Sequence, residues 1–150
     1  MSHIFDFMVE SYRNAPINQL LGCTLEVRDS EATIHLPIAK KLCHAFGAVH
    51  GSMYFKCLDD AAFFAAQSLR DDVWVLTADF HTRLLRPIPL SNGTLRAEGR
   101  VVSSSRRLII AESILYDDEG REVGRGTGSF MLSEIPLGAE SPIGGPRLGG

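Results

Sequence analysis

The chain has 150 residues, of which 45% are hydrophobic and 22% are charged, and its formal net charge is −3. This length fits one domain with a substantial core, and the weak negative charge argues against a nucleic-acid partner. The sequence has no apolar run of the roughly 18 residues that a membrane span requires. The first residues lack the basic and apolar segments of a signal peptide. We therefore expect one cytoplasmic domain with no membrane partner.

The first third of the chain predicts a short helix and two strands. Residues 4–13 are amphipathic and end before Asn14-Ala15-Pro16, where a helix would stop. Alternating patterns then predict two short strands, with a turn between them and an irregular loop after them. The strands cover residues 24–27 and 32–36, the turn residues 28–31, and the loop residues 37–47.

Residues 51–69 predict the main helix of the protein. They contain no proline and no glycine after Gly51, and they are long enough for about five turns. Their apolar side chains surround most of the helical circumference, which is typical of a buried helix rather than a surface one.

Four extended patterns follow this helix, and a turn at residues 117–120 precedes the last of them. The predicted strands are 73–85, 93–103, 108–116 and 122–132. About six strands with one long helix predict an α+β fold in which the sheet curls around the helix. The exposed edges of such a sheet predict self-association.

The end of the chain is rich in proline and glycine. From Ile135 onward we expect no core element and a mobile segment. The predicted division is a single domain over residues 1–135 and a flexible tail over residues 136–150.

Three cysteines, Cys23, Cys43 and Cys57, have no short pairing and an odd count. Neither a disulfide framework nor a zinc site fits this pattern. We expect each to be a small buried apolar residue.

Asp59 is the residue of the long helix that most needs an explanation. Phe55 precedes it by four positions and Phe63 follows it by four, so its own face of the helix is apolar. A buried unpaired carboxylate has a raised pKa, and such groups concentrate at functional sites. Its neighbour Asp60 has Lys56 at i−4 as an ion-pair partner. The structural alternative is that Asp59 accepts a hydrogen bond from a neighbouring group.

The turn His50-Gly51-Ser52 begins the same helix. Free N–H groups and the positive end of the helix dipole lie at such a terminus. They stabilise negative charge on a carbonyl oxygen, and Gly51 has no side chain to block its approach. A plain tight turn is the alternative interpretation.

These residues resemble a known family. His44 to Ser52, followed by Leu58-Asp59, is similar to the signature of phenylacetate-pathway-type (PaaI-like) hot-dog acyl-CoA thioesterases. That signature has an Asn, five residues, His-Gly-Gly, and an Asp nine positions after the His. The similarity covers about residues 40–133. Its further segments are Asp79–Pro87, Gly99–Val102, Arg106-Arg107, Asp118–Gly120 and Gly126–Phe130.

The resemblance implies a hot-dog fold and hydrolysis of acyl-CoA thioesters, with a medium-chain or aromatic acyl group, to free acid and CoA. It implies no cofactor beyond the CoA of the substrate, and a homodimer or a dimer of dimers (homotetramer). Asp59 would be the general base or nucleophile, and the Gly51 N–H of the partner subunit would polarise the carbonyl. Thr77 would help place the water, and His50 would fix the loop that presents Gly51.

Two positions depart from the family pattern. Ser52 replaces the second Gly, and its hydroxyl can cap the helix or contact substrate. His44 stands where the family usually has Asn, and an imidazole changes charge near neutral pH whereas an amide does not. We hypothesise that His44 orients the water or the leaving group and adds a pH dependence to hydrolysis.

Other residues are weaker candidates. Phe55 is a candidate for contact with the acyl group, and Arg86 for contact with CoA phosphates, with core packing and ordinary surface charge as the alternatives. Asp79 and His81 share a strand face but lack a third metal ligand, which favours a solvated face over a metal site.

Two other functions stay open at this point. One is a non-catalytic hot-dog module that binds acyl-CoA. The other is a hot-dog hydratase or dehydratase, which needs a paired acid and His, and the sequence has no Asp-x₄-His of that kind.

Overall fold

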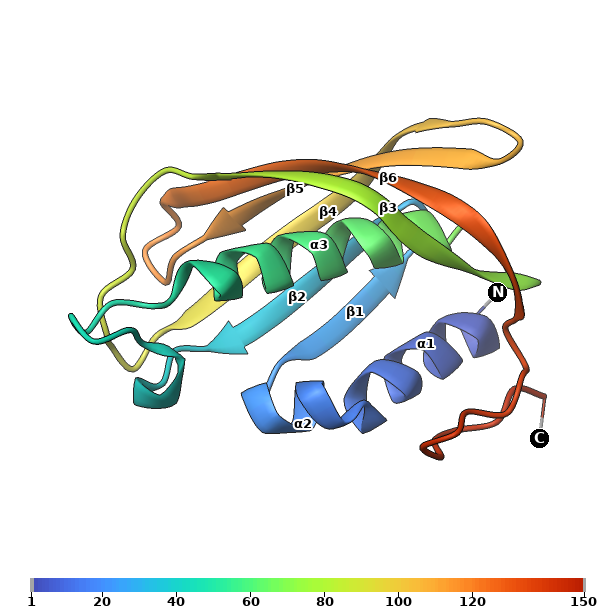
Figure 1. The fold of residues 1–150 in the computed structure, drawn as a ribbon, viewed down its shortest axis with the longest axis horizontal. Coiled ribbons are helices and arrows are strands. Elements are labelled where there is room, and N and C mark those ends of the chain that lie inside the picture. The colour runs from blue at the N-terminus through green and yellow to red at the C-terminus, as the bar shows by residue number, and fades with distance from the viewer. Residues whose placement is uncertain (1, 150) are drawn as a thin grey trace.

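A six-stranded antiparallel sheet curls around one long helix in the computed structural model, which describes residues 2–149 (Figure 1). The strand order is β1-β2-β4-β5-β6-β3, so β1 and β3 are the two edges. The strands are β1 (Thr24–Arg28), β2 (Glu31–Pro37), β3 (Val73–Leu84), β4 (Thr94–Ser104), β5 (Leu108–Tyr116) and β6 (Glu122–Pro136). The helices are α1 (Ser2–Asn14), α2 (Pro16–Leu21), α3 (Gly51–Gln67) and a 3-10 turn, Lys40–Leu42. This is the predicted α+β hot-dog fold, which is confirmed.

Helix α3 contacts all six strands and forms the centre of the core. Its buried side is rich in alanine, and Ala61, Ala62, Ala65 and Ala66 are fully buried. Gly99 of β4 lies directly against it, because a Cβ there would stand 2.2 Å from the Ala61 carbonyl oxygen. Small residues on both surfaces therefore let the helix axis approach the sheet closely.

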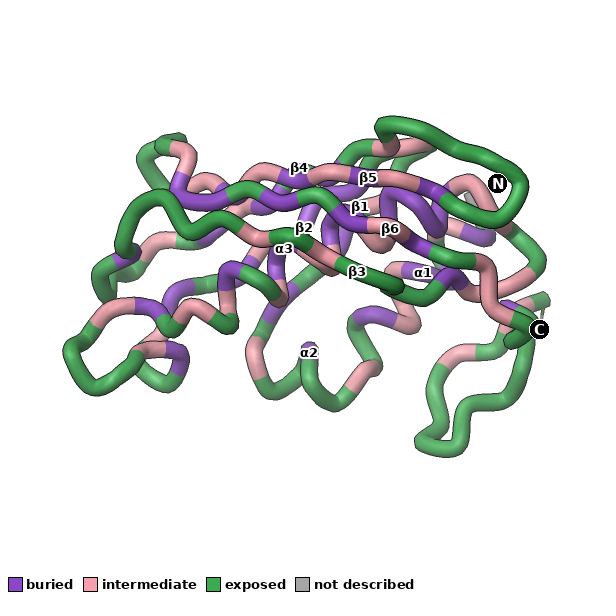
Figure 2. The backbone as a smooth tube through the Cα atoms, turned by 45° about the horizontal axis from the view of Figure 1, so that its top comes forward, coloured by how far each residue is buried: buried purple, intermediate pink, exposed green. Residues whose placement is uncertain are grey.

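Strand β5 and the first half of β4 alternate between buried and more exposed positions, as a sheet with one covered face requires (Figure 2). Their inward side chains join those of α1 in the main core. The fully buried large members include Met8, Ile34, Leu36, Leu58, Leu95 and Leu115.

Strand β3 contains a β-bulge at Ala78. Thr77 pairs with Phe130 of β6, and Asp79 pairs with Ser129, so Ala78 is an extra residue. Side chains three apart on a regular strand point to opposite faces. Because of the bulge, Thr77 and Phe80 both face α3.

The predicted elements lie within a few residues of the observed ones, with three differences. Helix α2 and the 3-10 turn were not predicted, and β6 continues to Pro136 because that residue pairs with Val73. The expectation that nothing from Ile135 onward joins the core is wrong at Leu137, which is 1% exposed. The mobility of the tail stays a prediction.

Cys23 and Cys57 are buried as predicted, whereas Cys43 is only half-buried, and all three are free thiols. Among residues 2–149, no helix combines the length and apolar character needed to cross a membrane.

Candidate active site

One face of α3 carries three of the predicted site residues. Gly51, Phe55 and Asp59 are spaced by four positions, so they follow one another along a single helix face. Phe55 is 44% exposed and Asp59 is partly exposed, so this face is not covered by the rest of the chain.

Strand β3 runs antiparallel to α3 along the edge of this face, and each helix residue meets one strand residue. An added Cβ at Gly51 would lie 3.0 Å from Leu84 Cδ2. The rings of Phe55 and Phe80 meet edge-on with centroids 5.7 Å apart. The third pair is bonded, because the Thr77 hydroxyl donates to Asp59 Oδ1 at 3.0 Å. The pairs along the helix are thus Gly51 with Leu84, Phe55 with Phe80, and Asp59 with Thr77.

The carboxyl group of Asp59 is desolvated. Burial, the largest effect, raises its pKa, the Thr77 hydrogen bond and the charge of Lys56 lower it, and the charge of Asp60 raises it, which leaves the pKa at about 6. At neutral pH the group is therefore mostly ionised and still basic enough to accept a proton.

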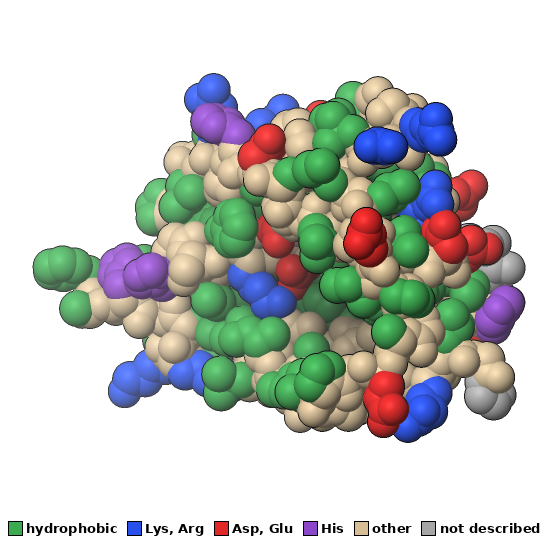
Figure 3. Space-filling model, turned by 45° about the vertical axis from the view of Figure 1, so that its right-hand side comes forward, with side chains coloured by type: hydrophobic (Ala, Val, Ile, Leu, Met, Phe, Trp, Pro, Cys, Tyr) green, Lys and Arg blue, Asp and Glu red, His purple; other side chains and the backbone are tan. Residues whose placement is uncertain are grey.

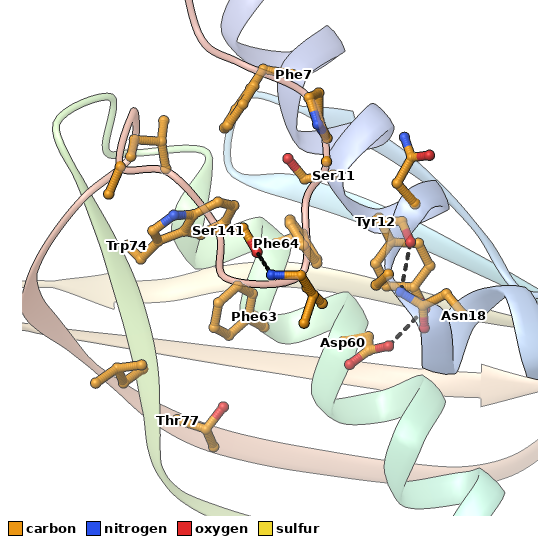
Figure 4. A pocket seen from close by; sticks show the side chains of 18 of the residues that line it. Phe7, Ser11, Tyr12, Asn18, Asp60, Phe63, Phe64, Trp74, Thr77 and Ser141 are labelled. Carbon is orange, nitrogen blue, oxygen red and sulfur yellow. Dashed lines mark hydrogen bonds between the residues drawn. The ribbon is translucent and has the colours of Figure 1, made fainter.

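Asp59 and Thr77 lie at one end of a cavity of about 590 Å³. Figure 3 shows the corresponding hollow, with hydrophobic side chains around it and charged side chains at its edge. The aromatic residues of its wall come from α1, α3 and the start of β3, and they are Phe7, Tyr12, Phe63, Phe64 and Trp74 (Figure 4). The volume lies within the roughly 300–1,000 Å³ of small-molecule sites.

A hydrogen-bonded cluster forms part of the wall of this cavity. Lys56 forms the predicted ion pair with Asp60, and the Tyr12 hydroxyl donates to Asp60 Oδ2 at 2.6 Å. Lys56 also donates to Asn18 Oδ1 at 2.6 Å. Burial and the neighbouring carboxylate raise the pKa of Tyr12, which keeps its proton. The ion pair and the Tyr12 hydrogen bond thus account for the charge of Asp60. Asp59, in contrast, has one carboxylate oxygen with no protein partner in the described chain.

The N-terminus of α3 leaves a backbone donor free. His50 is the N-cap, and its Nδ1 accepts the Ser52 N–H at 3.0 Å and lies 2.7 Å from the Ser52 hydroxyl. The capping acceptor is therefore His50 and not Ser52. Within residues 2–149 no protein group accepts the Gly51 N–H.

A groove of about 280 Å³ lies beside this terminus. His44, Gly51 and Arg86 line it. The imidazole Nδ1 of His44 accepts the Phe46 N–H at 3.1 Å, so the ring is held by its own loop. Three predicted site residues thus meet at this end of the helix.

The predicted site residues form two separate groups in one chain. Gly51 and Asp59 are eight residues apart on one helix, which corresponds to about 12 Å along its axis. A carbonyl group that bonds to the Gly51 N–H cannot also lie next to Asp59 of the same chain. Asp79 and His81 add nothing to either group, and no cluster of metal-ligating side chains occurs in the described residues.

The sequence analysis missed part of the cavity wall. Trp74 and most residues from Ala139 to Pro146 line the cavity, although none of them was a candidate. The apolar residues of the tail could have indicated that it packs against the core, and they are Leu137, Ile143 and Leu148.

Comparison with known proteins places this geometry in context. The family description "Thioesterase superfamily" matches residues 46–124, which include Gly51, Asp59 and Thr77. A Saccharolobus solfataricus protein named as an esterase, SSO1253, is 26% identical over 93 residues, covering 62% of this chain and 61% of its own length. A second such protein, SSO2140, is 20% identical over 116 residues, covering 77% of this chain and 81% of its own.

Solved structures share the fold at low sequence identity. The Escherichia coli PaaI protein from the phenylacetic acid degradation operon superposes with a TM-score of 0.81 at 15% identity, covering 90% of this chain and 96% of its own. A mutant of the Pseudomonas aeruginosa thioesterase PA1618 gives a TM-score of 0.75 at 18% identity, covering 86% and 92%.

Proposed function

The chain belongs to the thioesterase superfamily, and on this basis we propose that it hydrolyses acyl-CoA thioesters to free acid and CoA. The observation that carries the proposal is Asp59, a desolvated carboxylate with a pKa of about 6 at the mouth of an apolar cavity.

The proposed reaction uses Asp59 as general base. A water molecule near Thr77 gives a proton to the free oxygen of the Asp59 carboxylate, and its own oxygen attacks the thioester carbon. The carbonyl oxygen becomes an oxyanion, which a backbone N–H stabilises. The carbon–sulfur bond then breaks, and the proton on Asp59 passes to the leaving thiolate. Direct attack by Asp59 is the alternative role, and it forms an anhydride that water then cleaves.

The oxyanion donor comes from a second copy of the chain in this proposal. Residues 51 and 59 lie at equal distances from Phe55 along α3, so a two-fold axis near Phe55 brings Gly51 of the partner subunit to Asp59. The face around that axis exposes apolar side chains, including Phe55, Leu76 and Leu84. The edge strand β3 lies along it with one side unpaired within the described chain. Both features favour a homodimer across this face.

The groove at the partner's helix N-terminus is then the place for the CoA portion. Arg86 supplies a cation for phosphate, and His44 stands next to the free Gly51 N–H. We propose that His44 contacts the leaving-group side of the substrate from the partner subunit. No metal or redox cofactor enters this scheme.

Release of CoA thiol from a series of alkanoyl- and aryl-CoA esters tests the proposal. Asp59→Asn should lower kcat/KM by about 10²–10⁴-fold with the dimer intact. Asp79→Asn, an exposed carboxylate on the same strand as Thr77, is the matched control and should stay at the wild-type rate. Wild-type turnover by Asp59→Asn would refute the assignment. Binding of acyl-CoA without thiol release would instead indicate a non-catalytic module, and hydration of an enoyl-CoA would indicate a hydratase.

A further inference from the structure

We propose that the loop of residues 138–147, here called the C-terminal loop, closes the far end of the acyl cavity and limits the length of the acyl group. This inference deepens the proposed function and rests on it for the identity of the ligand. Two features of the C-terminal loop support it: both ends are attached to the core, and the tip lies at the cavity.

Both ends of the C-terminal loop are attached to the core. Leu137 is 1% exposed, and its N–H donates to the Asp72 carbonyl oxygen at 2.9 Å. Leu148 packs against the main hydrophobic core from the other end. The segment between them is therefore a loop with two fixed ends rather than a free terminus.

The loop also has internal contacts that define its shape. Glu140 and Arg147 form an ion pair of 3.0 Å across its base. At its tip the Gly144 N–H donates to the Ser141 carbonyl oxygen at 3.1 Å. Gly144 and Gly145 have φ values of 83° and 129°, which other residues rarely adopt. The turn is thus built from residues suited to it.

The tip of the loop forms one wall of the cavity. Ser141, Ile143 and Pro146 line the same space as Asp59 and Thr77. In Figure 4, Phe63 lies between Thr77 and the segment that carries Ser141. Ile143 lines the cavity and is 73% exposed, so it lies at the rim of this wall with much of its side chain in contact with solvent.

The position of Asp59 determines which part of a substrate meets this wall. The thioester carbon must lie beside Asp59, and CoA leaves toward the helix N-termini, so the acyl group enters the cavity. From Thr77 to Trp74 the cavity wall follows three residues of β3, or about 10 Å. An extended chain of about eight bonds spans that distance. Longer acyl groups would then meet the C-terminal loop.

The wall is apolar on the sides of this path and has no unpaired charge at its end. Phe63, Phe64 and Trp74 surround the route, while the Lys56–Asp60 pair is satisfied within its own cluster. The ligand class that fits is an apolar acyl group of medium length, either a chain or a ring.

Binding of S-alkyl-CoA thioethers, from butyl to hexadecyl, tests the length limit without requiring catalysis. In the wild-type protein the dissociation constant, measured by calorimetry, should fall about fourfold for each added methylene and stop falling near eight carbons. The chain length at which the dissociation constant stops falling is here called the break. Removal of residues 139–150 should move the break to longer chains. Ile143→Trp, which keeps both anchors and fills the wall, should move it to shorter chains.

Pro142→Ala is the matched control, because Pro142 is an exposed neighbour of Ile143 that does not line the cavity. It should leave the break unchanged. If the truncated protein does not fold, Ile143→Trp alone decides the matter. The same break in wild type and Ile143→Trp would overturn the inference.

Thiol release from the matching thioesters separates this inference from the proposed function. A shifted break in thioether binding with no thiol release by the wild-type protein would refute hydrolysis and keep the C-terminal loop as the length limit. Thiol release with an unshifted break would keep hydrolysis and refute the role of the loop.

Discussion

Asp59 and Thr77 lie 18 residues apart in the chain, and their side chains share a hydrogen bond of 3.0 Å at the edge of the cavity. The bond occupies one oxygen of the carboxylate and leaves the other open. It also opposes the effect of burial on the pKa of Asp59. The bond therefore orients the proposed base and lowers its pKa from the higher value that burial alone would give.

Thr77→Val should move the pH dependence of hydrolysis upward. The wild-type kcat/KM should rise with pH through a midpoint near the Asp59 pKa of about 6, since the ionised form is the base. Loss of the hydroxyl removes a contact that lowers this pKa, so the midpoint moves to higher pH. Lys56 and Asp60 also act on the group, and both are unchanged in this variant. Thr77→Ser keeps the hydroxyl and should keep the midpoint. An unshifted midpoint in Thr77→Val would contradict the role of the bond.

Asp59→Asn should stabilise the fold at neutral and alkaline pH. The folded pKa of about 6 lies above the ordinary value of 3.8, so the folded state binds the proton more tightly than the unfolded state. The free energy of unfolding of the wild-type protein therefore falls as pH rises from about 4 to about 6. Above that range Asp59→Asn should be more stable by about 1–3 kcal/mol, and near pH 4 the gain should vanish. Urea unfolding at several pH values measures this, with Asp79→Asn as a control that should show no such gain.

Gly51→Pro should remove the proposed oxyanion donor with little damage to the helix. Proline is favoured at the first position of a helix, and the N-cap residue His50 has φ −62° and ψ 140°, which suits a residue before proline. We expect kcat to fall by about 10²–10³-fold. Gly51→Ala keeps the N–H and adds the same Cβ beside Leu84, so it should lose far less. If both variants lose the same amount of kcat and their circular dichroism is unchanged, the loss comes from the Cβ that crowds Leu84 and not from the missing N–H.

A mixture of two inactive variants should regain activity if the site spans two subunits. A mixed dimer of Asp59→Asn and Gly51→Pro keeps one site in which both residues are intact. Refolding the two chains together at equal amounts should restore about a quarter of the wild-type rate, since about half of the dimers are mixed. A site within one chain would give no recovery.

Much of the fold was predictable because its long elements have clear periodicity. The apolar circumference of α3 and the alternation along β5 identify both elements almost to their ends. Asp59 stood out because it lies on an apolar helix face, and burial raises its pKa as that position predicts, while the expected alternative, a hydrogen bond from a neighbouring group, is also present in the bond from Thr77.

The rest depends on contacts that periodicity does not encode. Thr77 lies beside Asp59 just before the bulge in β3, and without the family resemblance no pattern would have selected that residue. The cavity wall at Ile143 depends on the burial of Leu137 and Leu148, and single apolar residues between glycines and prolines have no period. Helix α2 is six residues long, which is too short for an amphipathic pattern to establish.

The bulge at Ala78 makes the two halves of β3 independent of each other. The half before it presents Thr77 to the carboxylate, and the half after it presents Phe80 and Leu84 to the exposed face of α3. Deletion of Ala78 would remove this interruption and turn one of these halves away from the helix. A change of one residue in chain length, with Gly51, Phe55 and Asp59 all unchanged, would thus separate the proposed base from the proposed subunit contact.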